Sequence, residues 1–445
     1  MPATAFQNHF FFCSKFMFLN MNRFLLLGGF LLWLGFAKAQ TQTDRIYREN
    51  IRGVSFFKQG DPYSFPLMEL GSGELLELHF DELGRQPRNY FYTFQLCNAD
   101  WSPADLNVFE YIRGFTQNRI LQYRMSSATS TDYVHYQVNL PEKNCMPFRS
   151  GNYLLKVFLN GDTSQLVLTR RMMIVQNQVP IGALALQPID PALQLTHQKI
   201  QVTLDVKSIN LFMQQQGKLF ILQNNRWETA KTPSQPLIIR ENLIEFNAEM
   251  DAVFPAGKEY RWADLRSIRF LSDRIDRVDN STLPNTVYLK TDADRTKTRY
   301  AFFPDLNGHF SIGTTDQFNT WWQTDYMNVH FSFEPANRQP YPGRDVYIWS
   351  EATLLFPREQ YKMEWNESRG LYEKTLQLKQ GYYSYAYVSA RSNDPVFRPD
   401  PSFTEGNYFE TENEYTILFY YRSFSARYDE LIGVHRLRTG PGLTR

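Results

Sequence analysis

Short runs in which apolar and polar residues alternate recur along most of the chain, and this feature constrains the fold more than any other. Examples are Leu76–Phe80, Tyr90–Leu96, Ile200–Val206 and Asp345–Trp349. A period of two places successive side chains on opposite faces of a β-strand, whereas a helix needs a period near 3.6. The sequence therefore predicts an all-β protein with little room for long helices.

Turn residues separate these runs and indicate how the strands are connected. Asn160-Gly161 lies between the strand-like runs Tyr153–Leu159 and Leu166–Val175, and it is a strong hairpin signal because both residues tolerate a positive φ. Many short strands at regular spacing predict immunoglobulin-like or E-set-like β-sandwiches in tandem. The length of 445 residues allows about three domains. We expect an N-terminal sandwich at 40–177, a middle β domain at 178–285 and a C-terminal sandwich at 286–445.

The N-terminus has the pattern of a targeting segment. An apolar run, Leu25–Phe36, follows Arg23 and precedes the small residues Ala37 and Ala39. This order predicts a signal peptide over 1–39, with Met21 as the true start and cleavage before Gln40. A permanent helical anchor is the alternative, but the run is short for a bilayer. We expect an exported protein.

Charge and cysteine content exclude some functions. Lys and Arg number 47 against 46 Asp and Glu, so no basic field indicates a nucleic-acid partner. Removal of 1–39 takes away three basic residues and no acid, and 44 minus 46 leaves −2. Cys97 and Cys145 remain in the exported part. A disulfide and two buried thiols are equal alternatives for them, and their spacing does not fit a zinc site.

The C-terminal part from 345 to 422 predicts one antiparallel module. Leu371–Leu378 reads as a strand, Lys379–Gly381 as a turn and Tyr382–Val388 as the returning strand. Tyrosines alternate along that strand, and a carboxylate-rich segment with Glu405 follows, which we interpret as an exposed acidic loop. These residues are the predicted partner-binding surface: Tyr382, Tyr383, Tyr385, Glu410, Glu412, Glu414 and Tyr415.

The sequence contains no pattern that predicts catalysis. A nucleophile elbow, a zinc-protease helix, a P-loop and a dinucleotide fingerprint are all missing. Asp305–Gly308 resembles the start of a calcium loop, but the carboxylates that should follow are absent, which favours an Asx turn. Asp325 and His330 are an odd number of residues apart, so a strand would place them on opposite faces. We expect no enzyme activity, no cofactor, no metal and no small-molecule substrate.

The charged residues between Glu259 and Arg266 have two interpretations. Arg261 and Arg266 alternate with Glu259 and Asp264, which favours a salt-bridged strand face over an anion site.

A loose resemblance concerns the aromatic residues of the last domain. Val346–Trp349, Trp365 and Gly381–Tyr385 resemble the starch- and glycogen-binding sandwich modules of amylolytic enzymes. Flat aromatic rings suit sugar faces, so a periplasmic or surface glycan-binding protein is the alternative function.

A closer resemblance covers nearly the whole exported part of the chain. The motifs that carry it are Cys97–Trp101, Tyr111–Phe115, Tyr133–Tyr136, Ser150–Tyr153, Thr169–Arg171, Gly257–Arg261, Asp264–Ser267, Asp305–Gly308, Asp325–Phe331, Leu378–Tyr383, Glu405–Asn407, Thr411–Tyr415 and Arg427–Gly433. In these motifs the chain resembles the plug protein family of the type IX secretion system. One departure is Trp349-Ser350-Glu351, where the family pattern has a glycine after the strand.

The resemblance implies a function. Plug proteins of this family are expected in the periplasm, against a very large outer-membrane β-barrel translocon whose periplasmic opening they seal in the idle state. The resemblance thus implies a non-enzymatic protein that is monomeric within a larger complex and has the translocon barrel as its partner.

Overall fold

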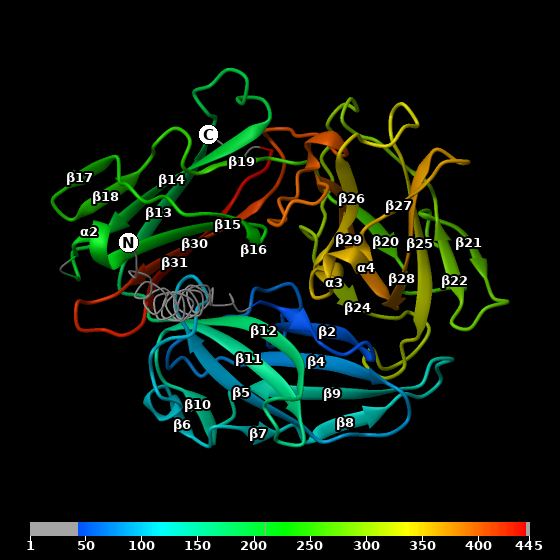
Figure 1. Ribbon diagram of the computed structural model, residues 1–445, viewed down its shortest axis with the longest axis horizontal. Helices are drawn as coiled ribbons and strands as arrows, with labels where there is room; N and C mark the ends of the chain where they lie inside the picture. Colours follow the sequence, from blue (N-terminus) through cyan, green and yellow to red (C-terminus); the bar gives the residue numbers. More distant parts are fainter. Residues whose placement is uncertain (1–42, 210, 442–445) are drawn as a thin grey trace, which may run out of the picture. The chain divides into compact units, whose positions relative to one another are not determined.

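The computed structural model describes residues 43–209 and 211–441, and the predicted signal peptide lies outside them. Strands dominate this part of the chain, which confirms the all-β prediction. The strands form three β-sandwiches, which we call the first, middle and third sandwich (Figure 1).

The first sandwich packs the sheet β1-β12-β11-β5-β7, with β3 beside β12, against the sheet β2-β4-β9-β8. The strands of the larger sheet are β1 Arg45–Ile46, β3 Leu67–Glu69, β5 Tyr90–Cys97, β7 Asn118–Arg119, β11 Gly151–Leu159 and β12 Leu166–Val175. The other elements are β2 Ile51–Lys58, β4 Leu76–Leu83, β8 Gln122–Met125, β9 Tyr133–Leu140, the pair β6 Ile112–Gly114 and β10 Cys145–Pro147, and the 3-10 helix η1 Val108–Glu110. Asn160 and Gly161 have φ values of 53° and 76° between β11 and β12, which confirms the predicted hairpin.

The middle sandwich contains the last two strands of the described chain. Its sheets are β13-β14-β18-β17, with β19 beside β14, and β16-β15-β30-β31. The elements are β13 Ile181–Leu186, β14 His197–Asp205, α2 Met213–Gln216, β15 Gly217–Gln223, β16 Arg226–Lys231, β17 Ile238–Arg240, β18 Leu243–Phe246, β19 Val253–Pro255, β30 Glu414–Tyr421 and β31 Glu430–Arg438. In Figure 1 the C-terminal strands, in red, run beside the green strand β15.

The third sandwich is built around the long strand β29. One sheet contains β20, β29 and β24, with β26 also paired to β29, and the other runs β21-β22-β25-β28-β27, with β23 beside β25. The elements are β20 Arg261–Asp264, β21 Ile275–Asp279, β22 Thr286–Leu289, β23 Asp292–Ala293, β24 Phe310–Ile312, β25 Tyr326–Glu334, β26 Arg344–Trp349, α3 Glu351–Leu354, α4 Arg358–Tyr361, β27 Glu364–Asn366, β28 Leu371–Lys379, β29 Gly381–Arg391 and η2 Pro401–Phe403.

The strand pairing does not follow the sequence order that the predicted domain boundaries assume. Ile417 of β30 lies opposite Ile221 of β15, so a strand placed in the C-terminal domain completes the middle sandwich. Conversely β20, which precedes the boundary at 285/286, pairs with β29 of the third sandwich. An apolar strand pattern shows that a segment needs neighbours but does not say which strands supply them.

The prediction that Lys379–Gly381 joins two paired strands is wrong, because the strands on either side belong to different sheets. β28 pairs with β25 and β27, whereas β29 pairs with β20, β24 and β26, so the chain crosses between the two sheets at Gln380. A Cβ on Gly381 would lie 2.3 Å from the backbone oxygen of Ser311, a distance that no side chain tolerates. The glycine is therefore required by the close approach of β24.

An apolar cluster joins the first and middle sandwiches. Leu154 and Met173 of the first sandwich pack in one buried cluster with Leu418 and Tyr420 of β30. The backbone N–H of Ala99 also donates to a carboxylate oxygen of Asp429 at 3.0 Å. The strand that completes the middle sandwich thus also forms its junction with the first.

Candidate functional site

The structure places three of the predicted partner-binding tyrosines in hydrophobic cores. Tyr383 and Tyr385 of β29 are 3% and 1% exposed between the sheets of the third sandwich, and Tyr415 is fully buried in the middle one. Their hydroxyls donate to the Lys379 carbonyl (2.6 Å), to Asp292 Oδ2 (2.8 Å) and to Gln198 Oε1 (2.7 Å), respectively. The expected wall of tyrosines is therefore core rather than surface, because these side chains have no free face.

The other four predicted residues do not form one surface. Tyr382 is half-buried on β29, with the Arg266 guanidinium 5.9 Å from its ring centroid. Glu414 belongs to the middle sandwich, where it pairs with Arg438 at 3.1 Å, and Glu412 accepts from Asn307 Nδ2 at 3.2 Å. Glu410 is exposed, so among the predicted acidic residues it remains the clearest candidate for contact with a partner.

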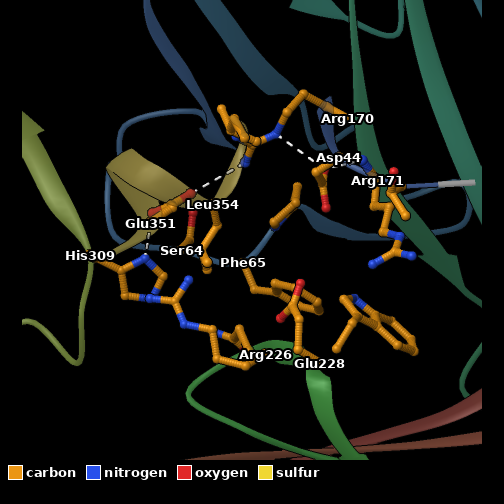
Figure 2. Close-up of a pocket in the computed structure, with 15 residues that line it drawn as sticks. Asp44, Ser64, Phe65, Arg170, Arg171, Arg226, Glu228, His309, Glu351 and Leu354 are labelled. Carbon is orange, nitrogen blue, oxygen red and sulfur yellow. Dashed lines mark hydrogen bonds and ion pairs between the residues drawn. The ribbon is translucent and has the colours of Figure 1, made fainter. Parts of the chain in front are cut away.

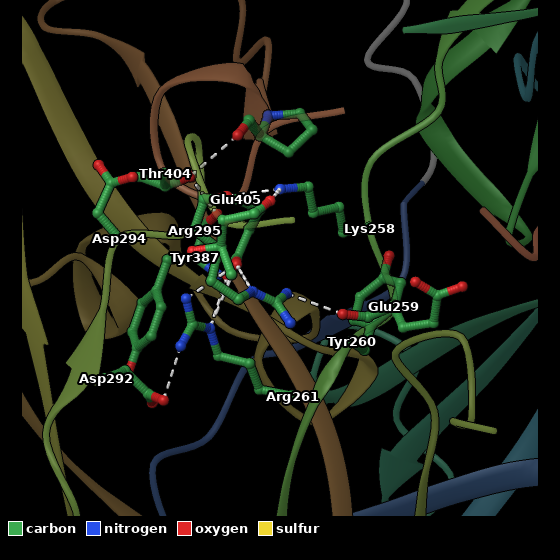
Figure 3. A network of polar contacts seen from close by, with 12 residues as sticks. Lys258, Glu259, Tyr260, Arg261, Asp292, Asp294, Arg295, Tyr387, Thr404 and Glu405 are labelled. Atoms are coloured by element: carbon green, nitrogen blue, oxygen red, sulfur yellow. Dashed lines mark hydrogen bonds and ion pairs between the residues drawn. The ribbon is translucent and has the colours of Figure 1, made fainter. Parts of the chain in front are cut away.

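Glu405 is a buried ion-pair residue, and its assignment to an exposed acidic loop is wrong. It is 1% exposed and accepts from Arg261 Nη2 at 2.9 Å and from Arg295 Nε at 2.6 Å (Figure 3). The backbone N–H of Tyr387 donates to its other oxygen at 2.9 Å. Burial raises the pKa of Glu405, but the two guanidinium groups outweigh burial and bring that pKa to about 2.

The same network corrects the predicted salt-bridged strand face. Arg261 does not pair with Glu259; its Nη1 donates to Asp292 Oδ1 at 2.8 Å. Arg266 does pair with Asp264, at 2.6 Å, on the exposed edge of β20. Arg261 therefore ties β20 and β23 to Glu405, at the start of the segment that leads into the middle sandwich.

A buried carboxylate, Asp81, joins the first and third sandwiches. Asp81 lies on β4 and is 1% exposed. Its Oδ2 accepts from Lys379 Nζ at 2.5 Å and from the Tyr326 hydroxyl at 2.6 Å, both in the third sandwich. His135 Nδ1 lies 2.7 Å from the other carboxylate oxygen. A buried ion pair with complete hydrogen bonding fixes the relative position of the two elements that supply it.

Aromatic rings also pack together at the junction around Asp81. His79 stacks on Trp321 with ring centroids 3.7 Å apart, and His79 Nδ1 lies 3.2 Å from His135 Nε2. Burial lowers the pKa of His135 to about 4, although its hydrogen bond to Asp81 opposes that shift. Near neutral pH the imidazole of His135 is therefore uncharged. Lys379 is then the only cation that contacts the carboxylate of Asp81 among the described residues.

A small cavity lies where all three sandwiches meet (Figure 2). Its volume is about 80 Å³, and Arg170 of β12, Arg226 of β16 and Glu351 of α3 line it. Glu351 accepts from Arg170 Nη2 at 3.2 Å and from His309 Nδ1 at 2.7 Å. Burial raises the pKa of Glu351, but His309 and Arg170 outweigh burial and bring it to about 2. The carboxylate thus links the first sandwich to the third.

Comparison with known proteins identifies the family. The model of the type 9 secretion system plug protein first domain matches residues 51–176, which run from the start of β2 to just beyond β12. The chain belongs to the type 9 secretion system plug protein family. This confirms the resemblance found in the sequence motifs.

Among solved structures, the plug-family chain is similar to a hypothetical protein from Parabacteroides merdae. The two are 32% identical with a TM-score of 0.85, and the match covers 89% of this chain and 99% of the other. No curated protein matches.

Within residues 43–209 and 211–441, no three His, Cys, Asp or Glu side chains are grouped so as to hold a metal ion. Cys97 and Cys145 are separate buried thiols rather than a disulfide, and burial raises the pKa of each to about 12. In the same residues, no helix is long and apolar enough to span a bilayer.

The aromatic residues that suggested sugar binding are mostly inaccessible. Trp349 is 4% exposed and packs against Phe397. Trp365 is half-buried, lies 5.0 Å from the ring of Tyr372, and donates from Nε1 to Glu367 at 2.6 Å. A flat sugar platform needs an open ring face, and Trp349 does not offer one.

The sequence patterns assigned no site role to four residues that form the junctions between sandwiches, namely Asp81, Lys379, Arg170 and Glu351. The available signal was charge at strand positions that alternate with core residues, such as Asp81 next to Phe80. On its own, that pattern predicts an ordinary solvent-facing side of the strand.

Proposed function

We propose that this chain is a non-enzymatic periplasmic plug that seals the periplasmic opening of the type IX secretion translocon in its idle state. The partner is the large outer-membrane β-barrel, and the plug lies at the inner face of the outer membrane after export by a cleaved signal peptide. The observation that carries the proposal is the plug-domain match within residues 51–176, in a chain of the plug family.

The junctions between the sandwiches support a steric mechanism. A seal must cover a wide opening without parting, so its domains need fixed relative positions. Here Asp81 with Lys379, and Glu351 with Arg170, connect the first sandwich to the third, while the cluster around Leu418 and Tyr420 connects it to the middle. Separating the first and middle sandwiches would expose the apolar cluster to water, and the buried ion pairs set the orientation of the first sandwich against the third.

The interface with the barrel has physical requirements. A stable and specific contact buries at least about 1,000 Å². Because the plug must yield to passing cargo, we expect an affinity between about micromolar and nanomolar, or −8 to −12 kcal/mol.

Affinity purification tests the partner. The tagged chain is isolated from gently solubilised outer membranes of a bacterium with this secretion system, and the co-purifying proteins are identified by mass spectrometry. Near-stoichiometric recovery of one giant barrel protein is the expected result. Recovery of polysaccharide alone, or of no partner, would overturn the proposal and favour the glycan-binding alternative.

A conductance measurement tests the sealing itself. The purified barrel is inserted into a planar bilayer, and the chain is added on the periplasmic side. We expect the open-pore current to fall and to recover when the chain is washed out. Unchanged current despite binding would show that the chain attaches to the barrel without closing it.

A charge-reversal pair tests the remaining acidic candidate. Glu410→Lys is expected to weaken binding to the barrel if the segment around Glu410 contacts it. Glu359→Lys, at an exposed glutamate of α4, makes the same charge change as a control. Equal binding by both variants would remove Glu410 from the interface.

A further inference from the structure

A second, larger cavity lies between the middle and third sandwiches. Its volume is about 350 Å³, which is within the range of small-ligand pockets. The hairpin of β15 and β16 forms one side, and β26, β29 and the segment 396–405 form the other. Arg226 lines this cavity as well as the smaller one of Figure 2.

The walls of the larger cavity are largely apolar and aromatic. Phe254 and Val388 are buried in the protein and Tyr260 is half-buried; all three line the space. Trp349 lines it as well, and Val396 stands at the wall with half of its surface exposed. Such walls favour a ligand with a hydrophobic body, because transfer of apolar surface from water into this space is favourable.

The charges that line the cavity are unbalanced. Four cations line it, namely Arg226, Lys231, Lys258 and Arg398, against two acids, Glu228 and Glu405. Four minus two leaves +2. Glu405 is already bound to Arg261 and Arg295, and Arg398 pairs at 2.7 Å with Asp394, outside the lining.

Among the remaining cations, Lys258 is offset by the nearby carboxylates of Glu405, Asp294 and Glu259, whereas Lys231 forms no ion pair with a described residue. Lys258 donates to the carbonyls of Arg295 and Thr298, and Lys231 lies 6.0 Å from the ring centroid of Phe254. The cavity therefore favours a ligand with negative charge.

One of these cations also has a buried donor without an acceptor. Arg226 is 6% exposed, and its Nη2 donates to the Gly308 carbonyl at 3.1 Å, but its Nε has no hydrogen-bond partner. The nearby carboxylate of Glu351 is taken by Arg170 and His309. A buried charged donor without an acceptor is unfavourable, so the guanidinium of Arg226 is incompletely paired within the protein.

We propose that the larger cavity binds a ligand with a hydrophobic body and a single carboxylate. The body packs against the wall at Tyr260 and Val396, and the carboxylate pairs with Arg226 and Lys231. A monoanion fits better than a phosphate dianion, because the mostly apolar walls make each additional charge costly to desolvate. The ligand is either a free amphiphilic acid or the C-terminal residue of a peptide with an apolar side chain. The proposal does not depend on the plug function.

Calorimetric titration of the whole exported chain tests the ligand chemistry. The probes are N-acetyl-L-phenylalanine and its carboxamide, which differ in the charged group alone. We expect saturable binding of the acid and binding at least about tenfold weaker for the amide, the factor that corresponds to one charge-assisted hydrogen bond. Equal binding of acid and amide, or no binding of either at millimolar concentration, would overturn the proposal.

A pair of variants tests the location. Lys231→Glu with Arg398→Glu reverses two charges at the cavity and should weaken binding of the acid at least about tenfold. Lys207→Glu with Arg436→Glu makes the same charge change at exposed positions outside the lining and should bind like the unchanged chain. Circular dichroism confirms that each variant is folded. Equal affinity of the two double variants would overturn the assignment to this cavity.

A peptide pair then distinguishes the two sources. An octapeptide that ends in phenylalanine is compared with its C-terminal amide. Tighter binding of the free-acid peptide than of N-acetyl-L-phenylalanine supports a chain end as the ligand. If the acetylated residue binds as tightly or more tightly, the result supports a free amphiphilic acid.

Discussion

At the residue scale, Asp81 shows how a charge can be buried without being left unpaired. Lys379, Tyr326 and His135 surround its two oxygens, and Lys379 also donates to the Trp321 carbonyl at 2.6 Å. Removing one partner of such a pair is far more harmful than removing both, since a lone buried charge keeps its full desolvation cost.

Lys379→Ala should therefore lower the free energy of unfolding by about 3–5 kcal/mol. The measurement is urea denaturation followed by circular dichroism. Arg85→Ala is the control, because it removes a partner of an exposed ion pair (Arg85–Asp132, 2.8 Å) and should cost less than about 1 kcal/mol. The double change Asp81→Asn with Lys379→Met should recover part of the loss. Equal costs for Lys379→Ala and Arg85→Ala would mean that water reaches the Asp81 junction.

Glu405 makes the stability depend on pH in acid. Its folded pKa of about 2 lies below its ordinary value of 4.5, so the unfolded chain takes up the proton first as the pH falls. The stabilisation is complete above about pH 4.5 and is lost toward pH 2, about 3 kcal/mol in all. Glu351 acts in the same direction.

In Glu405→Gln we expect a lower free energy of unfolding at pH 7 and a flatter profile between pH 5 and pH 3, measured by urea titration at each pH. The control Glu359→Gln, at an exposed position, should run parallel to the unchanged chain. A Glu405→Gln profile as steep as that of the unchanged chain would contradict the role of this carboxylate.

At the element scale, the pairing of β30 and β31 determines which segments belong to the middle sandwich. They leave the third sandwich through the segment anchored by Glu405 and complete a sheet with β15 and β16. Gln198 of β14 binds this segment, because its Nε2 donates hydrogen bonds to the carbonyls of Phe409 and Thr411. The middle sandwich is thus formed by two parts of the chain that are distant in sequence.

Fragments test this arrangement. Fragments 178–285 and 286–445 should each fail to fold cooperatively, because each one contains strands whose partners lie in the other. Fragment 178–441 holds both sets and should unfold in one urea transition with near-ultraviolet circular dichroism typical of packed aromatic rings. A cooperative transition for 286–445 alone would contradict the pairing of β30 with β15.

At the scale of the whole molecule, the three sandwiches are held against one another by buried contacts and are not separated by long linkers. The junction of the first and middle sandwiches is mainly apolar, whereas those of the first and third are built around buried ion pairs. These junctions hold the three sandwiches together, and a cavity lined by more cations than acids lies between the middle and third sandwiches.

Calorimetry checks whether the sandwiches unfold together. We expect one heat-absorption peak with a van't Hoff enthalpy close to the calorimetric one, because opening the junctions exposes buried apolar surface and breaks buried hydrogen bonds. Two resolved peaks would show that at least one sandwich unfolds independently.

The alternating pattern of single strands was sufficient to predict much of this protein. The all-β class and the plug family are confirmed, and so are the hairpin at Asn160-Gly161 and the Asx turn, in which Asp305 accepts from the backbone N–H of Asn307 at 2.6 Å. These features depend on residues close together in sequence, or on motifs read in order.

Contacts between segments that are distant in the sequence could not be predicted from the sequence patterns. Tyr383, Tyr385 and Glu405 were expected at the surface but are buried, and the strands around Gln380 belong to different sheets. The partner-binding role of Glu410 remains a prediction.

The sequence by itself determined which segments are strands, because backbone sterics and a period of two act within a few residues. Only the tertiary structure decided which strands pair and which charges are buried. A strand edge accepts any extended neighbour, and a polar face becomes a junction only when another domain covers it. Glu77, His79 and Asp81 alternate as a solvent-facing side would, yet Asp81 is buried because Lys379, almost 300 residues later in the chain, packs against it.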